Sequence, residues 1–436
     1  MNQYVRKFFG VMFQSQQTQQ YVRIQPQRLL ISPEEWHAHW QAKGFPWRTE
    51  PEIDAKRQEE LSKCRSLVPD IEKGIYPFKE MKLCRADIEW LLATHEDGLG
   101  PVDWSDESNR KRRGLDTRGA DLRQADLHGL PLACLRGGLS GIEWTKASVE
   151  QRNMAKLHLE GANLSSAHLE GANLAGVHLE LANCSQSHLE RTDLHAAHLE
   201  GTSFFETHLA GASLRGAFLD AATILSNIVL VNEEFGSAFL SDVHWGDTTL
   251  SLANWARIKI LGDEYESHQP TTWYGLAKNK SEWLRGYQRA VRANRQLALV
   301  LQREGLNEEA ARFAYRAQIL QRKVLWKQRE AGRWFFSLLF ALLAGYGYRI
   351  WRILAAYLII VSACAVAYFL LGLTYPPHLS LLQAFLESII AFHGRVFTEL
   401  FSPFTPQIWV TAFEAVAGLV IEGVFIAMLT QKFFGK

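Results

Sequence analysis

The most regular feature of the sequence is a large apolar side chain at almost every fifth position from residue 159 to residue 219. These central positions are Leu159, Leu164, Leu169, Leu174, Leu179, Leu189, Leu194, Leu199, Phe204, Leu209, Leu214 and Leu219. Two positions before nearly all of them stands a small residue, mostly Ala, Ser or Thr. A period of five matches neither an α-helix nor a β-strand, so the pattern predicts an internal-repeat architecture.

The repeating unit, as in ANLSS, ANLAG and TDLHA, resembles the A-(D/N)-L-x-x pattern of the pentapeptide-repeat family over roughly residues 120–257. Weaker units have the central residues Leu122, Leu127, Leu240, Trp245, Leu250 and Trp255. The resemblance implies a right-handed quadrilateral β-helix, in which four units form a coil of about 20 residues around stacked apolar side chains. We assign residues 115–260 to this domain, expect Cys184 to fill its core, and expect a bulge or loop at residues 232–237.

A second period of ten residues overlies the first one. Histidines precede six central positions, at His158, His168, His178, His188, His198 and His208, and glutamates follow five of them, at Glu160, Glu170, Glu180, Glu190 and Glu200. On a coil of about 20 residues, alternate histidines stack on opposite faces. We interpret these ladders as solvated faces multiplied by duplication, with a pH-sensitive or metal-binding surface as the alternative. No cofactor or resident metal is predicted.

The segment before the repeats is polar and irregular. We expect a mobile Gln-rich tail at residues 1–31 and a mixed, largely helical cap at residues 32–114, with helices at 53–66 and 85–95. The first residues have neither the apolar core nor the cleavage site of a signal peptide. Five widely spaced cysteines without a C-x-x-C pair indicate reduced thiols facing the cytosol.

Charge is distributed unevenly, although the whole chain carries only +1. Residues 120–257 carry 16 acidic and 8 basic side chains, whereas residues 271–352 carry 16 basic and 5 acidic ones. Some pentapeptide-repeat proteins resemble DNA in shape and charge and inhibit topoisomerases, which is one alternative function. The basic segment stands just before an apolar region, so we attribute it to a membrane surface and consider nucleic-acid binding unlikely.

The basic segment, residues 271–333, predicts a helical hairpin. Helices are expected at 280–304 and from residue 308 toward residue 331, with Gly305 between them. The hairpin is similar to one tetratricopeptide-type unit. Residues 334–348 have too few apolar positions to cross a membrane and predict an interfacial helix.

Residues 349–436 are interpreted as a membrane domain with two spans, at 353–373 and 409–429, each 21 uncharged or nearly uncharged residues long. Arginines before the first span and lysines after the second predict that both termini lie on the cytoplasmic side. The membrane is expected to be a bacterial-type cytoplasmic membrane. Between the spans, residues 379–392 are apolar but too few to cross, which favours a re-entrant helix.

Two spans around a re-entrant helix resemble the two-transmembrane potassium-channel superfamily over about residues 351–434. The stretch FEAVAGLVIEGVFIAMLTQKFF is similar to the inner helix of that superfamily. The filter position holds Phe392, His393, Gly394 and Arg395 instead of a TVGYG-like strand, so potassium selectivity is not implied. In a tetramer Arg395 forms a ring that either repels cations or pairs with Glu387, Glu399 or Glu414.

Within the second span, Glu414, Gly418 and Glu422 lie along one helix face. Intramembrane carboxylates are functional candidates, so we assign Glu414 and Glu422 to a pore lining, with interhelical hydrogen bonding as the alternative. Gly418 and Gly423 are candidates for a hinge or for close helix packing.

These patterns predict a multidomain chain: a β-helix, then an α-helical hairpin, then an all-α, two-span membrane domain with a re-entrant pore helix. The expected function is a homo-oligomeric, most simply tetrameric, ion channel in a lipid bilayer, gated by an unknown cytosolic ligand or protein partner. The main alternative is a non-conducting scaffold anchored to the membrane. An enzyme is not expected, because no P-loop, dinucleotide, metal-box or nucleophile motif is present.

Overall fold

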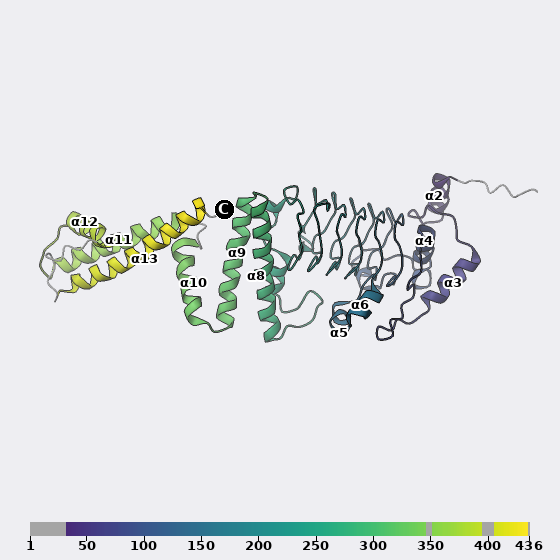
Figure 1. Cartoon of the computed structure of the whole chain (residues 1–436), viewed down its shortest axis with the longest axis horizontal. Helices are drawn as coiled ribbons and strands as arrows, with labels where there is room; N and C mark the ends of the chain where they lie inside the picture. Colours follow the sequence, from purple (N-terminus) through teal and green to yellow (C-terminus); the bar gives the residue numbers. More distant parts are fainter. Residues whose placement is uncertain (1–31, 346–350, 395–404, 435–436) are drawn as a thin grey trace, which may run out of the picture.

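The computed structural model describes residues 32–345, 351–394 and 405–434, which form an elongated molecule (Figure 1). A small helical cap lies at one end, stacked coils occupy the middle, and helices make up the remainder. The most apolar helices lie at the end farthest from the cap.

The elements follow the order of the chain. Before and within the coils, the helices are α2 (Pro33–Ala42), α3 (Ala55–Arg65), α4 (Arg85–Ala93), η1 (His95–Gly98), η2 (Asn109–Lys111), α5 (Gly141–Lys146) and α6 (Val149–Ala155). The last coils contain β1 (Val231–Asn232), β2 (Gly236–Ser237) and η3 (Trp255–Arg257). After the coils come α7 (Gly262–His268), α8 (Lys280–Arg303), α9 (Asn307–Lys327), α10 (Ala331–Ala344), α11 (Trp351–Gly372), α12 (Leu381–Phe392) and α13 (Pro406–Phe434).

Single parallel bridges join successive coils. Bridges such as His158↔His178 and His168↔His188 link residues 20 positions apart, and a new bridge follows every five residues. Each coil therefore has four sides, as the resemblance implied. The central leucines and the small residues before them are buried in one continuous core. Cys184 is among them, and burial raises the pKa of its thiol to about 12, which confirms it as a core residue.

Two insertions interrupt the coils. The bridge Asp121↔His158 spans 37 residues because α5 and α6 project from this coil. These two helices were not predicted from the sequence, although both begin with a capping box, at Ser140 and at Ser148. The second insertion is the antiparallel ribbon β1–β2, which occupies the expected irregularity at residues 232–237.

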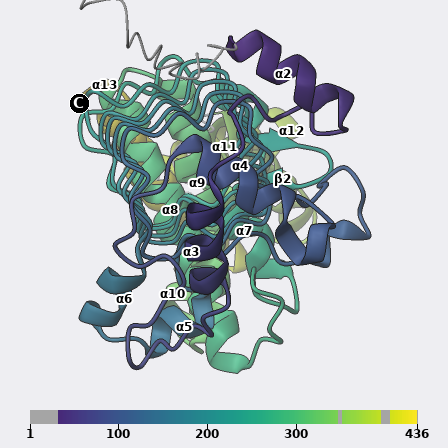
Figure 2. The same cartoon turned by 90° about the vertical axis from the view of Figure 1, so that its right-hand side faces the viewer.

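The helical cap closes the first coil. Figure 2, which looks along the stack, shows α3 and α4 lying across its end. Leu61 of α3 and Ile88 and Leu91 of α4 are buried in the same core cluster as the repeat leucines. Glu89 of α4 is also buried and accepts hydrogen bonds from the backbone amides of Thr49 and Glu50. The cap therefore shields apolar side chains that an open coil would expose to water.

The hairpin α8–α9 covers the last coil. Leu297 and Leu301 of α8 and Phe313 of α9 belong to the core cluster of the β-helix. Several hairpin arginines bind the coils or α7: Arg292 pairs with Asp242, and Arg316 pairs with Glu264. Part of the positive charge of the hairpin therefore pairs with acidic side chains of the coils and of α7, and its attribution to a membrane surface stays a prediction for the rest.

The C-terminal helices include two, α11 and α13, that are long and apolar enough to cross a membrane. Only 28% and 22% of their most apolar windows are buried within this chain, so most of their apolar surface is exposed. Figure 1 shows α10 running across the direction of α11 and α13. This orientation is the one expected of an interfacial helix beside two spans.

Candidate functional site

The short helix α12 is packed against both long apolar helices. It begins with a capping box between Ser380 and Gln383 and ends at His393, before Gly394 in the left-handed backbone region (φ 71°). With 12 residues it is about 18 Å long, too short to cross the hydrocarbon core of a bilayer. α12 contacts α11 and α13, and α11 and α13 also contact each other.

Buried polar side chains tie α12 to its neighbours. Ser388 Oγ lies 2.9 Å from the carbonyl oxygen of Val361 on α11 and is hydrogen-bonded to Glu414 Oε1 on α13. Tyr368 of α11 donates a hydrogen bond of 3.0 Å to Thr411 Oγ1 of α13. Such bonds stabilise helix association where apolar contact alone provides little driving force. Ser388, Tyr368 and Thr411 were not predicted from the sequence, although a polar side chain inside an apolar helix is itself a signal.

Gly418 allows α13 to approach the end of α12 closely. A Cβ at this position would lie 1.8 Å from the carbonyl oxygen of Phe392, which a backbone atom cannot accommodate. Phe392 is itself buried, with its ring edge-on to Tyr357 at a centroid distance of 4.8 Å. Gly418 is thus explained by close packing against α12.

The end of α12 is attached to α13 by a polar pair. His393 Nδ1 lies 2.5 Å from Glu422 Oε1, and both side chains are nearly half exposed. Gly423, next to Glu422, is exposed, and no described atom lies within 4 Å of where its Cβ would stand. Of the predicted filter residues, Arg395 lies outside the described residues, as does Glu399.

The pore-lining assignment is corrected for Glu414. This residue is fully buried between α12 and α13, so it does not line an open lumen. The interhelical interpretation holds for Glu414. Glu422 keeps an exposed surface. Glu387 of α12 is buried, and its Oε1 has no hydrogen-bond partner among the described residues.

The contacts also define how far α12 extends along α11. It runs antiparallel to α11, since Ser388 meets Val361 and Phe392 meets Tyr357. Tyr357 is about 22 Å along α11 from Gly372. At the start of α13, Gln407 Nε2 donates to the carbonyl oxygen of Tyr375, just after the C-terminal end of α11. The chain thus runs back along α11 through α12 and starts α13 near the C-terminal end of α11.

The histidine ladders form the second candidate site. The rings of His158, His178 and His198 stack at centroid distances of 5.2 and 4.7 Å, and His168 stacks on His188 at 4.8 Å. The first ladder continues through Phe218 and His244, which were not predicted to belong to it. Each of these two residues directly precedes a central apolar residue, as the histidines do, and this position in the sequence could have identified them.

The glutamates beside the histidines differ between the two faces. Glu170 and Glu190 are buried, whereas the side chains of Glu160, Glu180 and Glu200 are 30–35% exposed. The hydrogen bond with Glu190 raises the pKa of His188 above the ordinary imidazole value. The two faces are therefore chemically unequal although their sequences repeat.

Comparison with known proteins identifies the repeats. The family model described as pentapeptide repeats matches residues 145–180 and 182–220 with eight copies. No curated protein shows significant similarity to the chain.

Similar solved structures include HetL, a pentapeptide repeat protein involved in heterocyst differentiation regulation from the cyanobacterium Nostoc sp. strain PCC 7120. It is 22% identical over 39% of this chain and 63% of HetL, with a TM-score of 0.15. Rfr23, a pentapeptide repeat protein from the cyanobacterium Cyanothece 51142, is 22% identical over 29% of this chain and 90% of its own, with a TM-score of 0.12. QnrB1, a plasmid-mediated fluoroquinolone resistance protein, is 14% identical over 32% of this chain and 66% of its own, with a TM-score of 0.15. The matches span less than two thirds of HetL and of QnrB1, and TM-scores this low support no functional inference.

Proposed function

We propose that this chain, which combines a pentapeptide-repeat domain with two helices able to cross a membrane, is one subunit of a homo-oligomeric ion channel that is not selective for potassium. The observation that carries the proposal is α12, an apolar helix too short to span that lies deep between two helices long enough to do so. A helix that ends at such a depth leaves backbone groups that must be buried in protein or face water. A water-filled pore in an oligomer satisfies this requirement.

The exposed face of α13 supports an oligomer. Trp409, Phe413, Val416 and Val420 are exposed along one side of this helix at spacings of three and four residues. One chain contributes one re-entrant helix, which does not enclose a pore by itself. Four copies around an axis, with these faces against neighbouring subunits or lipid, give the arrangement that the resemblance implies.

The contacts between domains support control of the pore from the cytosol. The hairpin α8–α9 shares a core with the β-helix, and α10 contacts α9, α11 and α13. A ligand or protein partner that shifts the β-helix or its cap would therefore act on α13 through packed helices. In the rival function, a membrane-anchored scaffold, the same contacts serve only to hold the β-helix at the membrane. Topoisomerase inhibition through DNA mimicry stays an untested prediction.

The function is tested with purified full-length protein in liposomes. Wild-type protein is expected to release entrapped cations or anions, and Glu422→Gln is expected to change the flux severalfold, because it removes a half-exposed carboxylate beside the end of α12. Leu419→Ala is the matched control, since Leu419 lies exposed on the same helix. Equal flux through Glu422→Gln and the wild type would remove Glu422 from the conduction pathway, and no flux from any variant would favour the scaffold.

The proposed topology places both termini in the cytoplasm, and it predicts opposite labelling of two thiols. Thr374→Cys, exposed after α11, should react with a membrane-impermeant maleimide in intact cells. Cys84, a native exposed thiol of the cap, should react only after the cells are permeabilised. Labelling of Cys84 in intact cells with protection of position 374 would reverse the orientation.

A further inference from the structure

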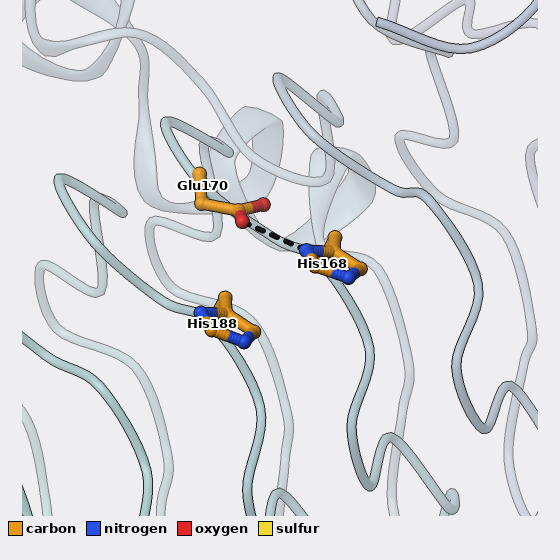
Figure 3. A group of neighbouring side chains, drawn as sticks. All are labelled: His168, Glu170 and His188. Atoms are coloured by element: carbon orange, nitrogen blue, oxygen red, sulfur yellow. Dashed lines mark hydrogen bonds and ion pairs between the residues drawn. The ribbon is translucent and has the colours of Figure 1, made fainter. Parts of the chain in front are cut away.

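One face of the β-helix brings metal-ligating side chains together beside a cleft, with two glutamates buried and the histidines partly exposed. We call His168, Glu170, His188, Glu190 and His208 the covered ladder. Parallel bridges place His168 beside His188 and His188 beside His208 on successive coils. Figure 3 shows His168 and His188 side by side, with Glu170 hydrogen-bonded to His168.

The donor atoms of the covered ladder form two overlapping groups. His168, Glu170 and His188 make the first group, and His188, Glu190 and His208 make the second, with ligand atoms within 4.8 Å of one another in each. Nδ1 of His168 lies 2.9 Å from Glu170 Oε1, and Nδ1 of His208 lies 3.3 Å from Glu190 Oε1. His188 belongs to both groups, so an ion bound by either group would use it as a ligand. We therefore expect the ladder to bind one ion at a time.

The carboxylates of this ladder each have an unsatisfied oxygen. Glu170 and Glu190 are both 7% exposed, and Oε2 of each is buried without a hydrogen-bond partner among the described residues. A buried carboxylate oxygen without a partner is energetically costly. A bound cation would compensate both charges at the place where they are buried.

A cleft gives access to the covered ladder. It has a volume of about 700 Å³ and is lined by His168, Glu170 and Glu190 together with Trp104, Arg110 and Phe235. The positive charge of Arg110 does not compete for the glutamates of the ladder, because Arg110 pairs with Glu234 at 2.8 Å. A small hydrated ion therefore reaches the carboxylates from this side.

The opposite face provides an internal comparison. His178, Glu180 and His198 also form a group with ligand atoms within 4.8 Å. The side chain of Glu180 is 31% exposed as a whole, although its Oε2 is also buried without a hydrogen-bond partner among the described residues. The faces therefore differ in the burial of the whole glutamate side chain, and the covered ladder is distinguished by the cleft beside it.

We propose that the covered ladder binds one divalent cation of the late first transition row, with Zn²⁺ as the reference ion, through two imidazole nitrogens and one glutamate. Imidazole favours these metals over Mg²⁺ and Ca²⁺, which prefer sites made of oxygen. A tetrahedral ion with ligand bonds near 2 Å needs donor atoms about 3.3 Å apart, so rotation of the side chains is sufficient. This site is independent of whether the membrane domain conducts ions.

Titration of the metal-free full-length protein with ZnCl₂, after removal of any polyhistidine tag, tests the site by calorimetry. The expected result is saturable binding that Mg²⁺ does not displace, with an increase of the melting temperature in Zn²⁺. His188→Asn removes a ligand from both groups and should weaken binding at least about tenfold, the lower end of the effect of losing even an outer partner of a ligand.

Two further variants distinguish the loss of a metal ligand from a general loss of stability. His178→Asn, on the opposite face, should leave the binding that depends on His188 unchanged. Glu190→Gln keeps the shape of the side chain and should weaken Zn²⁺ binding without altering the melting temperature of the metal-free protein by more than His178→Asn does. No saturable binding by the wild type, or equal affinity in the wild type, His188→Asn and Glu190→Gln, would overturn the proposal.

Discussion

Replacing Arg215 by methionine is expected to lower the free energy of unfolding by about 3–5 kcal/mol, because buried Asp263 would lose its counter-charge and buried Glu266 would keep only the more distant Arg289, at 3.8 Å. Arg215 is buried between the coils and α7, and its guanidinium binds Asp263 Oδ1 at 2.8 Å and also Glu266, both on α7. Burial lowers the pKa of Arg215, but the two carboxylates outweigh burial, so the pKa is raised above its ordinary value. Thermal unfolding of the full-length protein measures the effect, with an expected decrease of the melting temperature on the order of 10 °C.

The matched control is Arg123→Met. Arg123 binds Asp121 with the same two-nitrogen geometry, at 2.9 and 2.7 Å, but lies on the surface of an early coil. An exposed pair contributes little to stability, so this change should leave the melting temperature nearly unchanged. Equal melting temperatures for the two variants would show that the contact between α7 and the coils does not depend on the ionic cluster.

The backbone amides of Leu240 and Ser241 explain why the Arg215 cluster matters for the whole molecule. Both donate to Asp263 Oδ2, at 2.7 and 3.0 Å, so α7 is bound to the last coils through the same carboxylate. The hairpin α8–α9 packs on α7. Loss of Arg215 should therefore weaken the connection between the β-helix and the C-terminal helices as well as the local fold.

The second large effect is expected from Gly418→Ala. The added Cβ would stand 1.8 Å from the carbonyl oxygen of Phe392, so α12 must move away from α13. Overpacking against a backbone atom in a tight helix interface is expected to cost more than about 3 kcal/mol. The measurement is the thermal stability and the monodispersity of the detergent-purified protein, both of which should decrease.

Gly423→Ala is the control for this change because it alters the same helix five residues later. No described atom lies within 4 Å of the position that the added methyl group would occupy, so the substitution should be neutral or slightly stabilising, as Ala favours helix over Gly. If Gly418→Ala were as stable as the wild type, the packing of α12 described above would be incorrect.

The repeat coils could be predicted from the sequence because each pentapeptide contacts its equivalents in the neighbouring coils. The apolar period therefore shows directly which residues are buried, as for Cys184 and the central leucines. Length and composition were likewise sufficient to find α11 and α13. The apolar period and the long apolar stretches are both signals from residues close together in sequence, and the same residues form the coils and the long helices of the structure.

Contacts between distant segments could not be predicted in this way. The place of Glu414 in an apolar helix suggests a pore-lining carboxylate, whereas the fold sets it beside Ser388, 26 residues earlier. The pairing of Arg316 with Glu264 joins residues 52 positions apart, and no period in the sequence indicates it. Glu170 likewise lines one cleft together with Trp104 and Phe235, and neither of these belongs to the ten-residue period.

The central claim is that α12 and its neighbours form part of an ion-conducting pore, and planar-bilayer recording of the purified full-length protein tests it most directly. We predict unitary currents whose reversal potential under a potassium gradient differs from the potassium equilibrium potential, because the filter position lacks a TVGYG-like strand. Absence of unitary currents under voltage, pH and Zn²⁺ changes, or reversal at the potassium equilibrium potential, would contradict this claim.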